Sequence, residues 1–172
     1  THTWKINEYL VLNDGLRLSQ VRLNSTFNDK TFFPFPFSTV EQNNTAVNGS
    51  LGLIVKAPDT WRFSINLSTG FRAPNVDDLS KVFESVPGSV IVPNPDLKPE
   101  YTYNGEVGIS KTFGQGVNRS VLGYYTLYQD AITVQSYSFN GQDSLLFDGV
   151  LSRVTSSANA GEAYLYGGEA RL

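Results

Sequence analysis

The sequence WRFSINLSTGF, residues 61–71, alternates between large apolar side chains and small or polar ones. Every odd-numbered residue except Thr69 is aromatic or aliphatic, whereas the even-numbered residues are polar or glycine. Successive side chains of a β-strand point to opposite faces, so this period of two predicts a strand with one apolar face and one polar face.

The same period recurs along most of the chain, and helical periodicity is nearly absent. Near the start, a series of apolar residues from Trp4 to Leu18 occupies even-numbered positions, so these side chains would share one face of a strand. This pattern favours one long strand over 4–24. A hairpin turn at Asn13-Asp14-Gly15 is the alternative. We therefore predict about six strands, over 4–24, 44–57, 61–71, 101–113, 118–137 and 159–172.

The connections between these strands alternate in length. Tight turns are expected at 57–60 and 114–117, and long segments at 25–43, 73–100 and 138–158. Membrane barrels have short turns at one end and long loops at the other, so we expect the long segments to lie together. The prediction is an all-β, antiparallel up-and-down meander. It forms an incomplete section of a large transmembrane β-barrel over 1–172, a single unit without a plug domain.

Strand length agrees with a membrane span. Eleven residues at roughly 3.3 Å each extend about 36 Å, and a tilt near 45° projects this to about 25 Å, the height of a barrel's apolar band. Trp61 and Phe71 are then expected near the two membrane interfaces, where aromatic side chains gather.

Composition excludes several classes of function. The net charge of −3 argues against nucleic-acid binding, which needs a basic face to neutralise phosphates. The chain of 172 residues has no cysteine and one histidine, His2. Thiol chemistry, a catalytic triad and a histidine-built metal site are therefore not expected. We predict no enzyme, no cofactor and no metal site.

Two short motifs flank the longest of the expected loops. Residues 70–76 read Gly-Phe-Arg-Ala-Pro-Asn-Val, and residues 93–100 read Pro-Asn-Pro-Asp-Leu-Lys-Pro-Glu. In this order, each joined to an amphipathic strand, they resemble the motifs of TonB-dependent outer-membrane receptors. Gly15-Leu16-Arg17 is similar to a segment on an earlier barrel strand of that family.

This resemblance implies a section of a transporter in the outer membrane of a Gram-negative bacterium, in contact with membrane lipid. Such a transporter imports a scarce nutrient, such as a ferric siderophore, another metal complex or a glycan. In the parent protein a plug domain and TonB would be its partners. The alternative from another class is a soluble β-rich module that binds carbohydrate or mediates adhesion.

The two motifs also have a direct physical interpretation. Pro74 cannot donate to a sheet ladder, so it ends the strand, and Asn94 favours an Asx turn. Arg72 is expected to pair with one of three carboxylates, those of Asp77, Asp78 and Glu100. We expect the motif residues to shape the exit from one strand and the entry to the next; they are Phe71, Arg72, Ala73, Pro74, Asn94, Pro95, Asp96, Leu97, Lys98, Pro99 and Glu100.

The first long loop carries an aromatic cluster, FFPFPF, at 32–37. Alternate prolines stiffen it, and exposed apolar clusters often mark binding surfaces, although packing against neighbouring loops is the simpler interpretation. Candidate contacts for a small-molecule or metal-chelate ligand are Phe32, Phe33, Phe35, Phe37 and Arg72. We further expect the chain alone to self-associate through its open strand edges.

Overall fold

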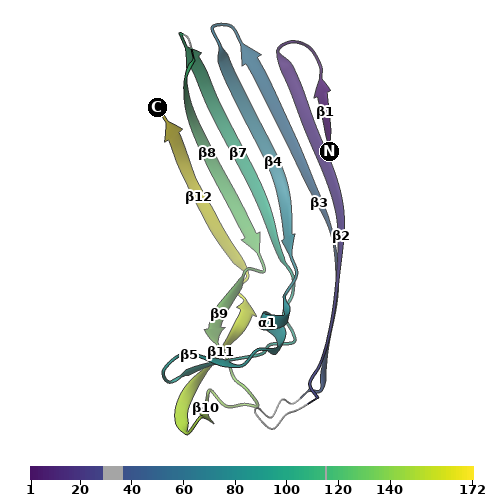
Figure 1. The fold of residues 1–172 in the computed structure, drawn as a ribbon, viewed down its shortest axis with the longest axis vertical. Helices are drawn as coiled ribbons and strands as arrows, with labels where there is room; N and C mark the ends of the chain where they lie inside the picture. Colours follow the sequence, from purple (N-terminus) through teal and green to yellow (C-terminus); the bar gives the residue numbers. More distant parts are fainter. Residues whose placement is uncertain (29–36, 115) are drawn as a thin grey trace.

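The computed structural model describes residues 1–28, 37–114 and 116–172. Its main sheet has seven strands, each antiparallel to the next and paired in chain order (Figure 1). This arrangement confirms the predicted all-β up-and-down meander. The strands are β1 (His2–Lys5), β2 (Leu10–Thr26), β3 (Thr39–Ala57), β4 (Trp61–Arg72), β7 (Glu100–Phe113), β8 (Val117–Gln129) and β12 (Glu162–Arg171).

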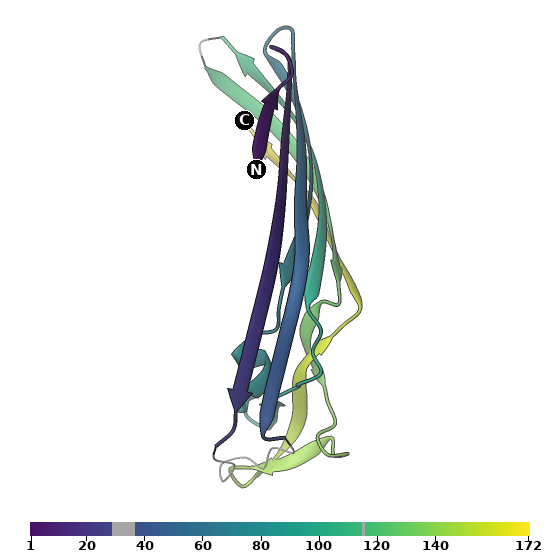
Figure 2. The same cartoon turned by 90° about the vertical axis from the view of Figure 1, so that its right-hand side faces the viewer.

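The main sheet is long, curved and open. Figure 2 shows its strands bending together along their length, and Figure 1 shows β1 and β12 at opposite edges. Strand β1 pairs only with β2, and β12 only with β8, so the described strands do not close on themselves. An open curved sheet is what an incomplete section of a barrel wall predicts.

The prediction of one strand over 4–24 is wrong. The chain turns between Lys5 and Leu10, where the Asn7 side chain accepts hydrogen bonds from the backbone N–H groups of Tyr9 and Leu10, and Asn13-Asp14-Gly15 lies within β2. Trp4 pairs with Leu12, so even-numbered residues pair with even-numbered residues across the turn. Directly paired residues share a face, and parity therefore could not distinguish this hairpin from a continuous strand.

The segments expected as long loops contain further structure. The described residues form twelve strands rather than six, because the first hairpin adds β1 to the main sheet and five strands make a second sheet. One pair in that sheet, β6 with β11, is parallel. The predicted strand over 118–137 is accordingly two strands in different sheets. The additional elements are α1 (Val76–Ser80), β5 (Phe83–Val86), β6 (Ser89–Val92), β9 (Ile132–Ser136), β10 (Ser144–Phe147) and β11 (Val150–Asn159).

Short and long connections lie at opposite ends of the main sheet. The β3–β4 and β7–β8 turns are together at the top of Figure 1, whereas α1 and the second sheet are at the bottom. The tight turns are made possible by left-handed backbone at Asp59, Thr60, Gly114 and Gly116. The predicted grouping of the long segments at one end is confirmed for their described parts.

The two faces of the main sheet differ in chemistry. We call the apolar face the one that carries the row formed by Leu53, Ile65 and Val107, and the polar face the one that carries Asn66 and Glu106. Large side chains on the apolar face are strongly exposed, for example Leu67 at 53% and Val107 at 60%. An exposed apolar surface this extensive requires a nonaqueous environment.

Burial is concentrated at the long-loop end instead. Among the described residues, one buried cluster consists of Val90, Val92 and Val154 of the second sheet together with Phe139 from the segment between β9 and β10. The other, which we call the junction cluster, consists of Val40, Leu79 and Leu97. Among the described residues, no helix has the length and apolar character needed to cross a bilayer.

Candidate functional site

The exit from β4 is held by Asp78. Pro74 follows the end of the strand and is fully buried, and α1 begins immediately afterwards. The Asp78 carboxylate accepts a hydrogen bond from the Arg72 guanidinium at 3.0 Å and another from the Asn75 backbone N–H at 3.2 Å. The Asn75 side chain in turn accepts from the Asp78 backbone N–H at 2.9 Å, which completes a capping box. Arg72 thus ties the end of the strand to the first turn of the helix.

The entry to β7 is held by amide side chains. The Asn94 Oδ1 atom accepts from the Asp96 backbone N–H at 3.1 Å, which is the predicted Asx turn, and its Nδ2 donates to the Ser157 carbonyl at 3.0 Å. Asn159 accepts from the Lys98 N–H at 2.9 Å and donates to the Lys98 carbonyl at 3.0 Å. Both ends of the motif are therefore joined to β11.

The same motif bridges a separation in the main sheet. Strand β3 pairs with β4 only as far as Ser50 opposite Ser68, whereas β2 and β3 continue together to Thr26 opposite Thr39. Beyond the separation, Leu79 of α1 packs against Val40 of β3 in the junction cluster. The Gln42 amide of β3 donates to the Pro95 and Leu97 carbonyls at 3.2 and 3.1 Å. The loop that follows β4 thus contacts β3 again in the region where the two strands are no longer paired.

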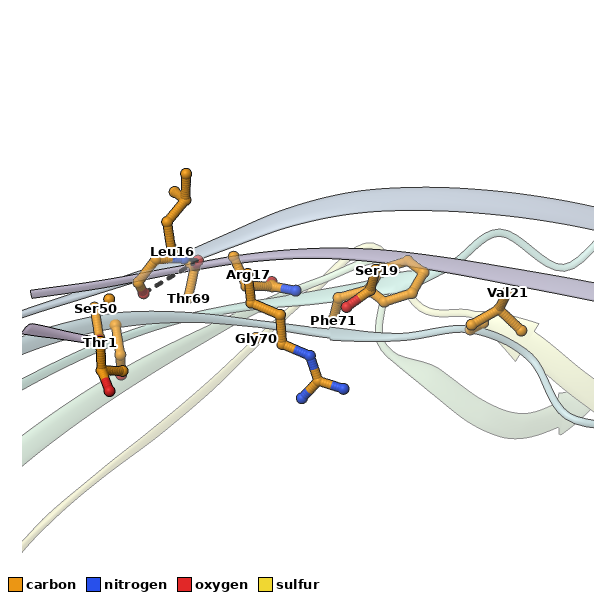
Figure 3. A pocket seen from close by; sticks show the side chains of 14 residues that line it. Thr1, Leu16, Arg17, Ser19, Val21, Ser50, Thr69, Gly70 and Phe71 are labelled. Carbon is orange, nitrogen blue, oxygen red and sulfur yellow. Dashed lines mark hydrogen bonds between the residues drawn. The ribbon is translucent and has the colours of Figure 1, made fainter.

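A groove of about 480 Å³ opens where β3 and β4 separate (Figure 3). At the edge of the groove, the Thr69 hydroxyl accepts a hydrogen bond from the Gly49 N–H at 2.8 Å. This contact lies one residue beyond the last β3–β4 ladder pair, Ser50 with Ser68. Arg17 lines the groove and extends away from β2, with the parity of the polar face. Within the described chain, Arg17 forms no ion pair with a carboxylate.

Comparison with known proteins assigns this architecture. The family model described as "TonB dependent receptor-like, beta-barrel" matches residues 1–172, the whole chain. The chain belongs to the TonB-dependent receptor family. The receptor section is therefore part of an outer-membrane β-barrel of a Gram-negative bacterium, in a family of transport proteins rather than enzymes.

Individual relatives agree with this assignment. The receptor section is 35% identical over 74 residues to the "Iron-regulated outer membrane virulence protein" of Vibrio cholerae serotype O1, a match that covers 42% of this chain and 11% of that protein. This chain therefore spans only a small part of the relative's length.

Solved structures show the same fold. The copper transporter OprC superposes with a TM-score of 0.73 at 22% identity, over 98% of this chain and 25% of that one. The siderophore receptor PirA from Pseudomonas aeruginosa gives 0.69 at 15% identity, over 98% of this chain and 29% of that one. The hemophore receptor HasR of Serratia marcescens gives 0.66 at 16% identity, over 94% and 29%.

Family membership orients the receptor section. Outer-membrane barrels have short periplasmic turns and long extracellular loops, so α1, the second sheet and the junction cluster face the outside of the cell. In such barrels the apolar face of the wall contacts lipid and the polar face lines the lumen. Arg17, on the polar face, therefore has the position of a lumen-facing residue below the extracellular loops.

The structure shows which partners Arg72 and the three nearby carboxylates have. Arg72 pairs with Asp78 among its three expected partners; Asp77 lies 4.0 Å from Lys81, and Glu100 accepts from the Ile132 N–H at 2.9 Å. The motif residues thus hold the loop in place. Their direct contact with a ligand, including that of Arg72, stays a prediction.

The aromatic candidates are only partly described. Phe37 is half-buried against the junction cluster, with its ring 5.4 Å from that of Phe27. Phe32, Phe33 and Phe35 lie outside the described residues. A ligand-binding role for these four side chains stays a prediction, and the contact of Phe37 with Phe27 agrees with the packing alternative.

Sequence reasoning did not single out the partners on β11. Ser157 and Asn159 are distant in sequence from the residues they hold, Asp78 and Lys98, and no local spacing marks them. In the sequence Arg17 stands out only through the family resemblance, because its position beside the strand separation depends on where β3 leaves β4.

Removal of the Arg72–Asp78 pair should loosen the loop exit measurably. In the full-length receptor we expect the Arg72→Ala and Asp78→Ala variants to couple by about 0.5–1 kcal/mol, because Asp78 is shielded while Arg72 is partly exposed to solvent. A double-mutant cycle on hydrogen exchange across 73–80 measures this. Strictly additive effects would show that the pair does not hold the exit.

Proposed function

We propose that this chain is the wall section of a receptor that imports a metal chelate, most specifically a ferric siderophore, through a plugged barrel powered by TonB. The observation that supports the proposal is the loop over 73–100, which lies between the two family motifs. Hydrogen bonds fix this loop to β11 and to β3, at the end that faces outward in barrels of the matched family. A rigid extracellular loop of this kind supports capture of a ligand before it enters the lumen.

Names of relatives narrow the class of ligand that we propose. The curated relative is called iron-regulated, and the similar structures include a siderophore receptor and a copper transporter. Ferric chelates commonly present anionic oxygen groups, which an unpaired arginine in a lumen-facing groove can bind through charge-assisted hydrogen bonds. We therefore assign Arg17 a role in guiding the chelate along the wall. The plug domain and TonB are proposed partners, as the family implies.

Uptake by the full-length receptor tests the proposal. Cells that carry the receptor should accumulate iron from at least one ferric siderophore, and accumulation should stop when either the receptor or TonB is deleted. Arg17→Ala should raise the half-saturating concentration, whereas the matched Arg22→Ala variant, on the same strand but with the opposite parity, should not. Uptake of glycans instead of chelates, or uptake without TonB, would contradict the proposal.

We predict that the loop over 73–100 does not bind haem. Residues 73–93 contain no His, Cys, Met or Tyr, and these are the usual side chains that ligate haem iron. Five carboxylates oppose two lysines in 73–100, which further disfavours a polyanionic ligand. Haem titration of the full-length receptor, with and without residues 73–100, checks this. Saturable binding with a shifted Soret band that disappears on deletion would overturn the prediction.

A further inference from the structure

Two cations face each other on the apolar face at the short-turn end of the sheet. Lys111 of β7 pairs directly with Arg119 of β8 in the ladder, and Lys111 is also opposite Trp61 of β4. Ile109 precedes Lys111 on the same face, two residues deeper into the apolar band. Like charges placed directly opposite each other on a sheet repel, so this pair costs stability unless an anion lies beside it.

Aromatic rings hold both cations in this position. The Lys111 Nζ atom lies 4.7 Å from the Trp61 ring centroid and 5.2 Å from that of Phe113, and the Arg119 guanidinium carbon lies 5.6 Å from Phe113. The Trp61 ring is stacked on Phe63 at 6.3 Å. Cation–π contacts fix the two charges against the sheet instead of letting them extend freely into solvent.

No carboxylate neutralises the pair within the part of the chain that the structure describes. The ion pairs found there involve His2, Arg72, Lys81 and Arg171, and neither Lys111 nor Arg119 is among them. The cluster therefore combines two fixed positive charges and three aromatic rings, with no counterion among the described residues.

The position of the cluster identifies the anion. Aromatic side chains at the border of a barrel's apolar band lie at the level of the lipid headgroups, and the short-turn end faces the periplasm. We propose that Lys111 and Arg119 bind the phosphate of an anionic phospholipid in the periplasmic leaflet, with Trp61, Phe63 and Phe113 against the upper part of its acyl chains. A guanidinium can bind phosphate through two parallel hydrogen bonds, and the ammonium adds a third contact.

The chain contains a matched control for this site. Lys56 and Arg62 are also directly paired at the short-turn end, one on β3 and one on β4, but they have the parity of the polar face. The double variant Lys56→Gln/Arg62→Gln removes the same charge from the same end without touching the lipid-facing cluster. Lys111→Gln/Arg119→Gln removes the proposed headgroup contacts and leaves the aromatic rings.

Native mass spectrometry of the full-length receptor with added phosphatidylglycerol tests the proposal. Each cation beside an anionic headgroup contributes roughly a fivefold gain in affinity, so Lys111→Gln/Arg119→Gln should bind this lipid about 25-fold more weakly. The control variant should bind like the wild type, and phosphatidylethanolamine should bind more weakly than phosphatidylglycerol to the wild type.

Three results would overturn this inference. The first is unchanged lipid binding by Lys111→Gln/Arg119→Gln. The second is an equal loss in the control variant, which would show a general effect of charge. The third is full competition by inorganic phosphate alone, which would show a site for a free anion rather than for a lipid.

Discussion

Replacement of Leu79 by alanine in the full-length receptor should lower the local stability of the extracellular loop by about 2–5 kcal/mol. The Leu79 side chain is completely buried, in one cluster with the β3 residue Val40 and the motif residue Leu97. Its truncation removes apolar contacts and leaves a cavity where α1 meets the separated strands. Hydrogen exchange across 73–100 should become faster by more than tenfold, while exchange in β7 and β8 stays unchanged.

A second alanine on the same helix controls for helix propensity. Val76 is also in α1 but is 53% exposed, so Val76→Ala should change exchange by only a small amount. Equal effects of the two substitutions would mean that the junction cluster does not hold the loop against the wall.

The isolated chain should form oligomers or aggregates in water. Strand β2 pairs with β1 only over Val11–Asp14, which leaves the ladder edge of residues 15–26 open among the described strands, and β12 forms the other edge. Open edges template pairing with further chains. The apolar face adds to this effect, since Leu16 is 80% exposed and Leu18 73%.

Each large side chain that becomes fully buried on association contributes about 1.5–3 kcal/mol, so a few such contacts exceed the cost of ordering a weak interface. Light scattering should therefore report particles much larger than one chain, and detergent above its critical micelle concentration should disperse them. A stable monomer in water without detergent would be incompatible with a lipid-facing sheet.

Local pattern was sufficient for the central strands of the main sheet. Alternation over 61–71 specified which side chains share a face, and the structure places Phe63, Ile65 and Leu67 in successive rows with apolar partners on β3 and, for the first two, on β7. Proline and asparagine chemistry was likewise local, so the end of β4 and the turn at Asn94 could be predicted.

Pairing between segments distant in the sequence could not be predicted from local pattern. The parallel contact of β6 with β11 joins Ser89 to Arg153, which are far apart in the sequence, and β6 has only four residues, too few for alternation to mark it. Three carboxylates were equivalent partners for Arg72 until the capping box selected Asp78. The early hairpin was missed because a turn that pairs even with even residues leaves the parity pattern intact.

We expect this sheet to cross the outer membrane with its long loops outside the cell. Because the chain contains no cysteine, single cysteines can be introduced into a cysteine-free version of the full-length receptor. Gln142 is exposed between β9 and β10, in the long-loop region, and Asn118 is exposed at the start of β8, beside the β7–β8 turn. A membrane-impermeant maleimide added to intact cells should label Gln142→Cys at once and Asn118→Cys only after the outer membrane is permeabilised. Labelling of Asn118→Cys on intact cells, with Gln142→Cys protected, would contradict the account.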